Sequence, residues 1–358
     1  MIIAGPCIED VTEAHIEPYV SLSKAGYGDP AISDPRHLRW KFLHNPQGTS
    51  KAVHIFHEEQ LVARVVAMPR LFDYAGRSWR AAYIVDLLLH PDFRGIATLA
   101  KLMKGFRSLL DDFDAFLITP NPQGIAVWES LMKLQPRFDL GVNVAPLRPA
   151  TLLGKTFWRP AKRLSYVADS AWQLAARGAA SLACRAEFVV DRAWPEQAEL
   201  DELLTGQDTT LAAGRRDRAF LEWRFRDSPV FSYESSFIRK SGRLVACIVT
   251  RQTTYAGYNV RFVIDAFGRS EFSQAEWSSC AWELVRHAAT QGGPELLMIL
   301  GNTRCGPLEK LSGLPFVRVP PRLLPQRVPL FAGWCGPAAQ FDFSAQTLQF
   351  SLADCDMF

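Results

Sequence analysis

The chain has 358 residues, of which 48% are hydrophobic and 22% are charged, and its formal net charge is +3. This length accommodates two domains, and the composition is that of a folded globular protein rather than a disordered or fibrous one. The small net charge gives no argument for a nucleic-acid partner.

The seven cysteines are scattered along the sequence without a Cys-x-x-Cys pair. That pattern predicts reduced thiols rather than a disulfide framework or a zinc site, and we expect no metal. The first ten residues lack the basic segment and the long apolar run of a signal peptide. The most apolar stretch, residues 164–184, is interrupted by Asp169 and Arg177, so we expect no membrane span and a cytoplasmic protein.

The first predicted elements are a helix and three strands. Asp34 and Pro35 are a favourable N-cap and first-turn residue for a helix that carries Trp40 and Phe42. Alternating apolar residues then predict a hairpin with its turn at residues 59–60, followed by a long strand. The three strands are expected at residues 51–58, 61–68 and 77–90.

The hydrophobic period changes after the long strand. Pro91 ends this strand, and from Gly95 onward the apolar residues recur at helical spacing. These residues are Ile96, Leu99, Leu102, Met103, Phe106, Leu109, Leu110 and Phe113. A strand that enters a helix through a glycine-containing turn leaves unpaired N–H groups at the helix start, where a phosphate group can bind. A further strand and a turn follow, at residues 115–118 and 120–121.

An internal repeat organises the chain. Residues 38–46 read Leu-x-Trp-Lys-Phe-x-x-x-Pro, and residues 221–229 read Leu-x-Trp-Arg-Phe-x-x-x-Pro. Further matches follow in the same order and at a nearly constant offset. They pair Leu61–Ala63 with Leu244–Ala246, Tyr74–Gly76 with Tyr255–Gly257, Asp86 with Asp265, Asn121 with Asn302 and Glu129 with Glu309. We therefore predict a duplication.

The second copy repeats the predicted elements. Asp217 opens the helix of Trp223, and strands at 233–240, 243–251, 259–267 and 295–301 surround a helix at 274–291. We predict an α/β (α+β) fold of two tandem domains, each a mixed, mostly antiparallel sheet flanked by helices. The predicted division is 1–145 for the first domain, 146–188 for a partly helical connector, 189–335 for the second domain and 336–358 for a tail. The basic residues Lys155, Arg159, Lys162 and Arg163 are interpreted as a solvated face of the connector, with an anionic partner as the alternative.

The segment His90-Pro-Asp-Phe-Arg-Gly-Ile-Ala97 resembles the acyl-CoA pyrophosphate loop of the GNAT acyltransferase superfamily. The superfamily pattern is Gln/Arg-x-x-Gly-x-Gly/Ala after a strand. Gly95 and Ala97 fit it, whereas Asp92 stands where Gln or Arg is usual. Tandem GNAT-like proteins share the predicted element order, and the resemblance covers most of residues 12–135 and 189–320.

The resemblance implies an acyl-CoA-dependent N-acyltransferase. It would move an acyl group, with acetyl the expected one, from the CoA thioester to the amine of a small molecule such as an amino sugar or amino acid derivative. The second copy reads Phe-Gly-Arg-Ser-Glu at 267–271, without the Gly-x-Gly/Ala step. Glu271 would repel a pyrophosphate, so we expect acyl-CoA in the first copy only, with the second copy shaping the acceptor cleft.

Residues that would bind acyl-CoA follow from the same resemblance. The strand end would bind the pantetheine arm, the N–H groups of the loop would bind the pyrophosphate, and Asn121 would flank the departing CoA. The predicted residues are Leu88, Leu89, His90, Arg94, Gly95, Ile96, Ala97, Thr98 and Asn121. For Arg94 a helix-capping role is the alternative, and for Asn121 a turn role that it shares with Asn302.

The acid–base groups are less defined by the sequence. Asp86, Tyr83 and His90 are the candidate catalytic residues, because each is a possible proton carrier on or beside the central strand. The recurrence of Asp86 as Asp265 favours a structural hydrogen bond instead. Many relatives have a tyrosine acid on the next helix, where this chain has Trp128, which cannot serve as an acid.

Three other functions stay open at this level. A transferase could use an acyl carrier protein or an aminoacyl-tRNA as donor, although a tRNA user would be expected to be more basic. A non-catalytic acyl-CoA sensor would bind CoA without turnover, and a purely structural protein would not bind it.

Overall fold

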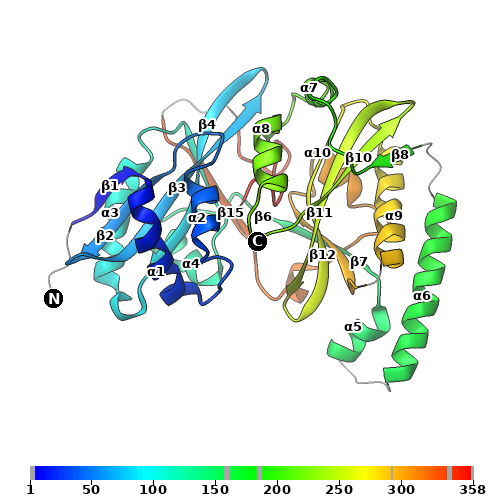
Figure 1. Cartoon of the computed structure of the whole chain (residues 1–358), viewed down its shortest axis with the longest axis horizontal. Helices are drawn as coiled ribbons and strands as arrows, with labels where there is room; N and C mark the ends of the chain where they lie inside the picture. The colour runs from blue at the N-terminus through cyan, green and yellow to red at the C-terminus, as the bar shows by residue number, and fades with distance from the viewer. Residues whose placement is uncertain (1–4, 157–161, 184–187, 292, 337–340, 356–358) are drawn as a thin grey trace.

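The computed structural model describes residues 5–156, 162–183, 188–291, 293–336 and 341–355. Within them, two mixed sheets of nine and seven strands lie side by side, and helices cover their faces (Figure 1). Most strand pairs are antiparallel, while β4–β5, β12–β13 and β9–β16 are parallel. The predicted fold class is therefore confirmed. Among the described helices, none is long and apolar enough to cross a membrane.

The first half of the chain forms the elements that the sequence predicts. Asp34 caps α2, where its carboxylate accepts the Arg36 N–H at 2.7 Å, and Pro35 is the first helical residue. The turn before β3 lies one residue earlier than predicted, because Glu58 adopts the left-handed conformation at φ 55°. The elements are β1 (Cys7–Asp10), α1 (Ile16–Tyr27), α2 (Pro35–Phe42), β2 (Lys51–His57), β3 (Gln60–Tyr74), β4 (Arg77–Leu89), α3 (Ile96–Leu109), β5 (Ala115–Ile118), α4 (Pro122–Ala126), β6 (Phe138–Asp139) and β7 (Gly141–Pro146).

The second half repeats this order. The turns after β3 and β11 have matching backbones, with φ 50° at both Ala75 and Ala256 and a left-handed glycine after each. The elements are α5 (Pro149–Thr156), α6 (Lys162–Ala183), β8 (Phe188–Asp191), α7 (Gln197–Thr205), β9 (Ala212–Gly214), α8 (Arg218–Leu221), β10 (Glu234–Lys240), β11 (Arg243–Tyr255), β12 (Tyr258–Gly268), α9 (Gln274–Gln291), β13 (Leu296–Gly301), α10 (Gly306–Leu311), β14 (Val317–Arg318), β15 (Pro329–Trp334) and β16 (Leu348–Gln349).

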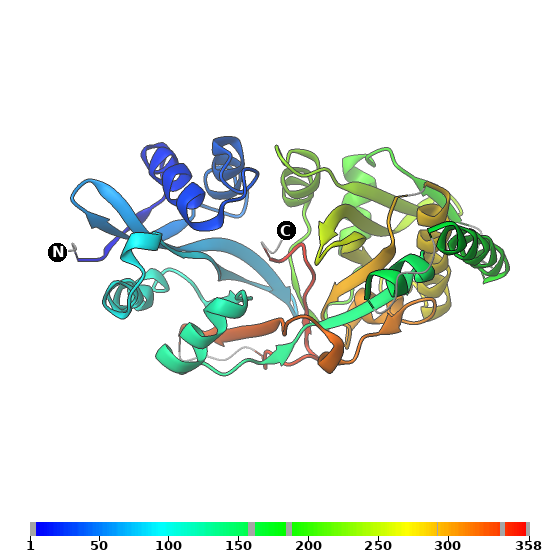
Figure 2. The same cartoon turned by 90° about the horizontal axis from the view of Figure 1, so that it is seen from below.

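The two halves exchange strands. β7 leaves the first half and pairs with β13 and β14 in the second sheet. β15 leaves the second half and pairs with β5 and β6 in the first sheet, where Figure 2 shows it in orange-red beneath the blue and cyan elements. The predicted domain boundary at residue 145 stays a prediction. Each sheet contains a strand that comes from the other side of this boundary or spans it.

The repeated tryptophans meet at the junction of the halves. The rings of Trp40 and Trp223 stack with centroids 4.8 Å apart. The indole N–H of Trp40 donates to the Trp223 carbonyl at 2.7 Å, and that of Trp223 donates to the Trp40 carbonyl at 2.9 Å. Both residues belong to one buried apolar cluster that draws on both halves, so the junction is built like a domain core.

The C-terminal segment is also buried at this junction. Asp354 accepts hydrogen bonds from Arg70 and Arg216, each at 2.7 Å, and all three side chains are at most 2% exposed. Burial alone would raise the Asp354 pKa, but the two guanidinium groups outweigh it and lower this pKa to about 2. The tail is thus held by a buried ion network with partners in both halves.

Candidate active site

A cavity opens where β4 and β5 diverge. These strands pair only along Ala81–Tyr83 and Ala115–Leu117, although β4 continues to Leu89. Beyond Tyr83 a cavity of about 750 Å³ lies between them, lined by Ile84–Leu89 and by Ile118–Asn121. Diverging strands no longer pair their facing N–H and C=O groups, so an extended ligand could bind to this edge of β4.

The start of α3 lies at one end of this cavity. Arg94, Gly95 and Ile96 line it, and Gly95 is the N-cap of α3 in an extended conformation. The helix has no side-chain cap and no acidic residue in its first turn. Residues 94–97 are exposed, whereas Thr98 is buried. The predicted loop is therefore an accessible helix N-terminus, with the geometry that binds anions.

The corresponding gap in the second half, between β12 and β13, is filled by the C-terminal segment of the protein. β12 and β13 pair along Val260–Val263 and Leu296–Ile299 and then diverge. The C-terminal segment enters this gap: the Ala353 N–H donates to the Ile264 carbonyl at 3.1 Å, and the Asn302 N–H donates to the Phe350 carbonyl at 2.8 Å. The second gap therefore has no room for an extended ligand at these positions.

The second helix start is occupied as well. Glu276 lies in the first turn of α9, and its carboxylate accepts the Ser273 N–H at 2.7 Å. Glu271 pairs with Arg269 at 2.5 Å. Carboxylates thus already satisfy the positive end of α9, which supports the prediction that acyl-CoA binds in the first half.

Asp86 lies at a bulge of β4, at the edge of the cavity. Its φ of 52° is left-handed, and its carboxylate contacts Lys41 at 3.0 Å and Arg64 at 2.5 Å. Burial alone would raise the Asp86 pKa, but the charges of Lys41 and Arg64 outweigh it and hold this pKa well below its usual range. Such a carboxylate is a weak base, which favours the structural reading. Its counterpart Asp265 is likewise buried and ion-paired, with Arg216.

Tyr83 lies at the point where β4 and β5 separate. Its hydroxyl shares a hydrogen bond with the Thr119 hydroxyl, and both residues line the cavity. A tyrosine in this place can give a proton to a thiolate formed between the strands.

The other two predicted residues, His90 and Asn121, have local structural roles. His90 is not among the residues that line the cavity, although Leu88 and Leu89 are. It precedes the short helical turn Pro91–Phe93, where its Nδ1 accepts the Asp92 N–H at 3.3 Å. Asn121 lines the cavity and caps α4 by accepting the Gly124 N–H at 2.8 Å. This bond matches the turn role that the repeat favours for Asn121.

The structure adds residues that the sequence analysis missed. Tyr27 and His37 from the first half, and Phe231 and Tyr255 from the second, line the same cavity. The His37 ring contacts the rings of Trp40 and Phe231, both at 5.3 Å between centroids. One signal for His37 was available in the sequence. The repeat places Phe220 at the position that corresponds to His37. A polar residue in one copy with an apolar residue in the other is typical of a functional position in the first copy.

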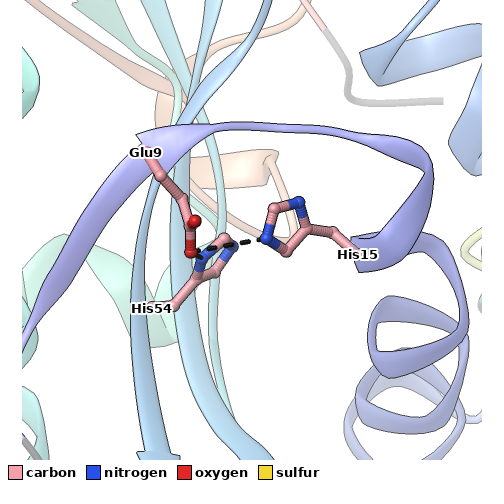
Figure 3. A group of neighbouring side chains, drawn as sticks. All are labelled: Glu9, His15 and His54. Carbon is pink, nitrogen blue, oxygen red and sulfur yellow. Dashed lines mark hydrogen bonds and ion pairs between the residues drawn. The ribbon is translucent and has the colours of Figure 1, made fainter.

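A second polar cluster, of Glu9, His15 and His54, lies at the β1–β2 edge of the first sheet (Figure 3). Glu9 Oε1 is 3.0 Å from His54 Nδ1 and 3.4 Å from His15 Nε2. The Thr12 N–H donates to His15 Nδ1 at 2.9 Å, so the His15 proton is on Nε2 and faces Glu9. A metal ion at Nε2 would have to displace that proton, and we therefore interpret the cluster as a hydrogen-bonded junction of β1, β2 and α1.

This junction predicts a loss of stability in acid. Burial lowers the His54 pKa from 6.5 to about 4, and hydrogen bonding to His54 lowers the Glu9 pKa. The unfolded chain binds protons at both groups before the folded chain does, so the free energy of unfolding should fall as the pH decreases from about 6.5 to about 4. Urea unfolding across this range should show a smaller decrease in His54→Asn than in the unmodified protein. The control His44→Asn, at an exposed position, should leave the decrease unchanged; an equal decrease in all three proteins would contradict the assignment.

Comparison with known proteins agrees with the resemblance that the sequence predicts. A sequence model of the acetyltransferase (GNAT) domain matches residues 8–112. No curated protein matches the chain.

Solved structures match over nearly the whole chain. A probable N-acyltransferase from Enterococcus faecalis has a TM-score of 0.60 and 11% identity, over 93% of this chain and 73% of the other. A GCN5-related N-acetyltransferase from Anabaena variabilis has the same score and identity, over 92% and 73%. N-myristoyltransferase from Saccharomyces cerevisiae, with bound myristoyl-CoA, has a TM-score of 0.57 and 11% identity, over 93% and 79%.

The chain has the fold of these acyltransferases, with an accessible helix start in one half and a filled one in the other. The GNAT match over residues 8–112 confirms the predicted resemblance for that part of the chain.

Proposed function

We propose that the chain transfers an acyl group from acyl-CoA to the amine of a small molecule, with acetyl the expected group and an amino sugar or amino acid derivative the expected acceptor. The observation that supports this most is the continuous path from the exposed start of α3, along the free edge of β4, into the 750 Å³ cavity. A cavity of this size suits a small ligand.

In this proposal the chain's first task is to bind and orient the donor. The N–H groups of residues 95–98 hold the pyrophosphate, because that of Arg94 already donates to the Pro91 carbonyl at 3.3 Å. The side chain of Arg94 adds charge. The pantetheine arm lies along the edge of β4, and backbone groups at Leu88 and Leu89 face the thioester. Positioning of donor and amine together supplies about 7–11 kcal/mol of the barrier.

The acyl transfer itself then takes place in the cavity, which residues of both halves line. The amine nitrogen attacks the thioester carbon, the C–N bond forms, and the C–S bond breaks to release the CoA thiolate. Tyr83, beside Thr119, gives the proton that this thiolate takes up, and it takes back the second proton that the nitrogen loses as the amide forms. The attacking ammonium must first lose a proton, and the strong ion pairs of Asp86 make that carboxylate a poor acceptor.

His37 is our candidate for that proton acceptor. It lies on α2, lines the cavity and contacts Phe231 of the second half, and it is 2% exposed. A neutral imidazole has one ring nitrogen that can accept a proton. His37→Gln should lower kcat by about 100-fold, while acetyl-CoA affinity stays the same. Steady-state kinetics measures kcat, and calorimetry measures the affinity. His44→Gln is the control at an exposed site, and an unchanged kcat in His37→Gln would contradict the role.

The activity itself is tested with the full chain. Calorimetry with acetyl-CoA and longer acyl-CoAs should show binding, and a thiol reagent should detect CoA release only when an amine from a panel of amino sugars and amino acid derivatives is present. Binding without thiol release for any amine would identify an acyl-CoA sensor instead. Absence of binding to every acyl-CoA would contradict the proposed donor and leave a carrier-protein donor or a structural role.

A further inference from the structure

Part of the cavity lining is aromatic and comes from both halves of the chain. Tyr27 is the last residue of α1, Tyr255 is the last residue of β11, and Phe231 lies between β9 and β10. Ile32 and Val328 add aliphatic side chains to the same lining. Rings and aliphatic groups in a cavity wall take up the apolar part of a ligand.

Phe231 is held beside the candidate proton acceptor. Its ring lies edge-on to the ring of His37, with centroids 5.3 Å apart and planes at 75°. The guanidinium group of Arg251 lies over the Phe231 ring, 3.8 Å from its centroid, although Arg251 is not among the residues that line the cavity. These two contacts fix the ring. An amine whose nitrogen reaches His37 therefore has Phe231 next to its body.

The charged groups of the cavity leave no partner for an acidic acceptor. Among the described lining residues, apart from His37, the charged side chains are Asp86 and Arg94. Asp86 is ion-paired with Lys41 and Arg64, and neither of these cations lines the cavity. Arg94 lies at the start of α3, where the donor pyrophosphate is proposed to bind. A carboxylate or phosphate on the acceptor would thus be taken out of water without compensation, which is costly.

The two tyrosine hydroxyl groups of this lining already have partners. The Tyr27 hydroxyl donates to Asp86 Oδ1 at 3.4 Å, and the Tyr255 hydroxyl shares a hydrogen bond with the side chain of Gln326. An amino sugar carries several hydroxyl groups, and each of them needs a partner once it leaves water. The lining therefore suits an apolar body better than a polyhydroxylated one.

We propose that the acceptor is a primary amine on an uncharged aromatic body, such as the amide of an aromatic amino acid. This inference rests on the proposed function and selects among the small amines named there. The amine enters as an ammonium ion, which the faces of aromatic rings attract. Its body packs against Phe231 and Tyr255, and its nitrogen gives a proton to His37. The nitrogen then attacks the thioester carbon, so that the C–N bond forms and the C–S bond breaks.

Four amines test this proposal with the full chain and acetyl-CoA. The α-amides of phenylalanine, alanine and glutamic acid have the same amine and differ in the side chain, and glucosamine represents the sugars. Thiol release should give phenylalaninamide a kcat/KM about tenfold above that of alaninamide, because the ring adds apolar contact. The glutamic acid α-amide and glucosamine should have lower values than alaninamide. A value for either of them that equals or exceeds that of phenylalaninamide would overturn the proposal.

Phe231→Ala tests the position of the aromatic body. The preference for phenylalaninamide over alaninamide should fall about tenfold, because the variant removes a ring that contacts the body of the aromatic amine alone. Calorimetry should show unchanged affinity for acetyl-CoA, which establishes that the variant is folded. Tyr166→Ala is the control, since Tyr166 is 75% exposed and lies outside the cavity; it should keep the preference. An unchanged preference in Phe231→Ala would overturn the proposal.

A binding measurement separates this inference from the proposed function. Calorimetry of each amine with the CoA-bound protein measures the acceptor site without turnover. Selective binding of phenylalaninamide without thiol release would support the aromatic acceptor site and contradict acyl transfer. Thiol release at equal rates with all four amines would support acyl transfer and overturn the aromatic acceptor. Equal or absent binding of all four amines, without thiol release, would overturn both.

Discussion

Gly95→Glu is expected to weaken acyl-CoA binding by about three orders of magnitude and to leave the fold intact. Two unit charges about 4 Å apart repel by about 4 kcal/mol at an effective dielectric constant of about 20, and each 1.4 kcal/mol is about tenfold in affinity. A Cβ atom at Gly95 meets no atom within 4 Å, and its φ of −171° suits any residue. The new carboxylate would even interact favourably with the helix dipole in the free protein.

Calorimetry with acetyl-CoA measures this loss of affinity, and circular dichroism checks the fold. Gly313→Glu is the control, because a Cβ atom there also meets no atom within 4 Å and the residue lies outside the cavity. It should bind acetyl-CoA like the unmodified protein. Normal binding by Gly95→Glu would show that the start of α3 does not contact the pyrophosphate.

Asp354→Ala is expected to have the largest effect on stability, a loss of about 3–5 kcal/mol in the free energy of unfolding. Removing one partner of a buried ion pair leaves the other charge without compensation in a region of low dielectric. Here the substitution takes a carboxylate from both Arg70 and Arg216, which are 1% and 2% exposed. Arg216 keeps its pair with Asp265, so the charge of Arg70 carries most of the cost.

Chemical unfolding followed by tryptophan fluorescence measures this change. The control is Asp139→Ala, which removes an ion pair with Arg327 whose side chains are 40% and 55% exposed. Such surface pairs contribute at most about 1 kcal/mol. If the two variants lost equal stability, the buried network would not be what holds the tail in place.

The local elements could be predicted from the sequence because their signals are local. The change from strand to helix at Gly95 and the helix from Gln274 to Gln291 both depend on hydrophobic period, and both were found in the structure. The repeat also predicted two similar sheets. It also predicted which copy would bind acyl-CoA, since Glu271 and its neighbours stand in the second copy where the first copy has the predicted loop.

The missed features depend on contacts between distant parts of the chain. β15 follows a proline-rich segment and pairs with β5, which lies far away in the sequence, so this pairing could not be predicted from the residues of β15. The low basicity of Asp86 depends on Lys41 and Arg64, which the fold brings to it from two other elements. The place of His37 in the cavity depends equally on Phe231 from the other half.

The exchange of β7 and β15 bears on how such a duplicated chain could arise. One copy of the repeat on its own would lack the strand that completes its sheet, and its free edge would expose unpaired backbone groups. Two identical copies could each supply the strand that completes the sheet of the other. The indole N–H of each tryptophan would then donate to the carbonyl of the equivalent tryptophan in the other copy. The single-copy ancestor of this protein would accordingly have been a symmetric homodimer, and gene fusion then allowed one half to keep an open cleft while the C-terminal segment filled the cleft of the other.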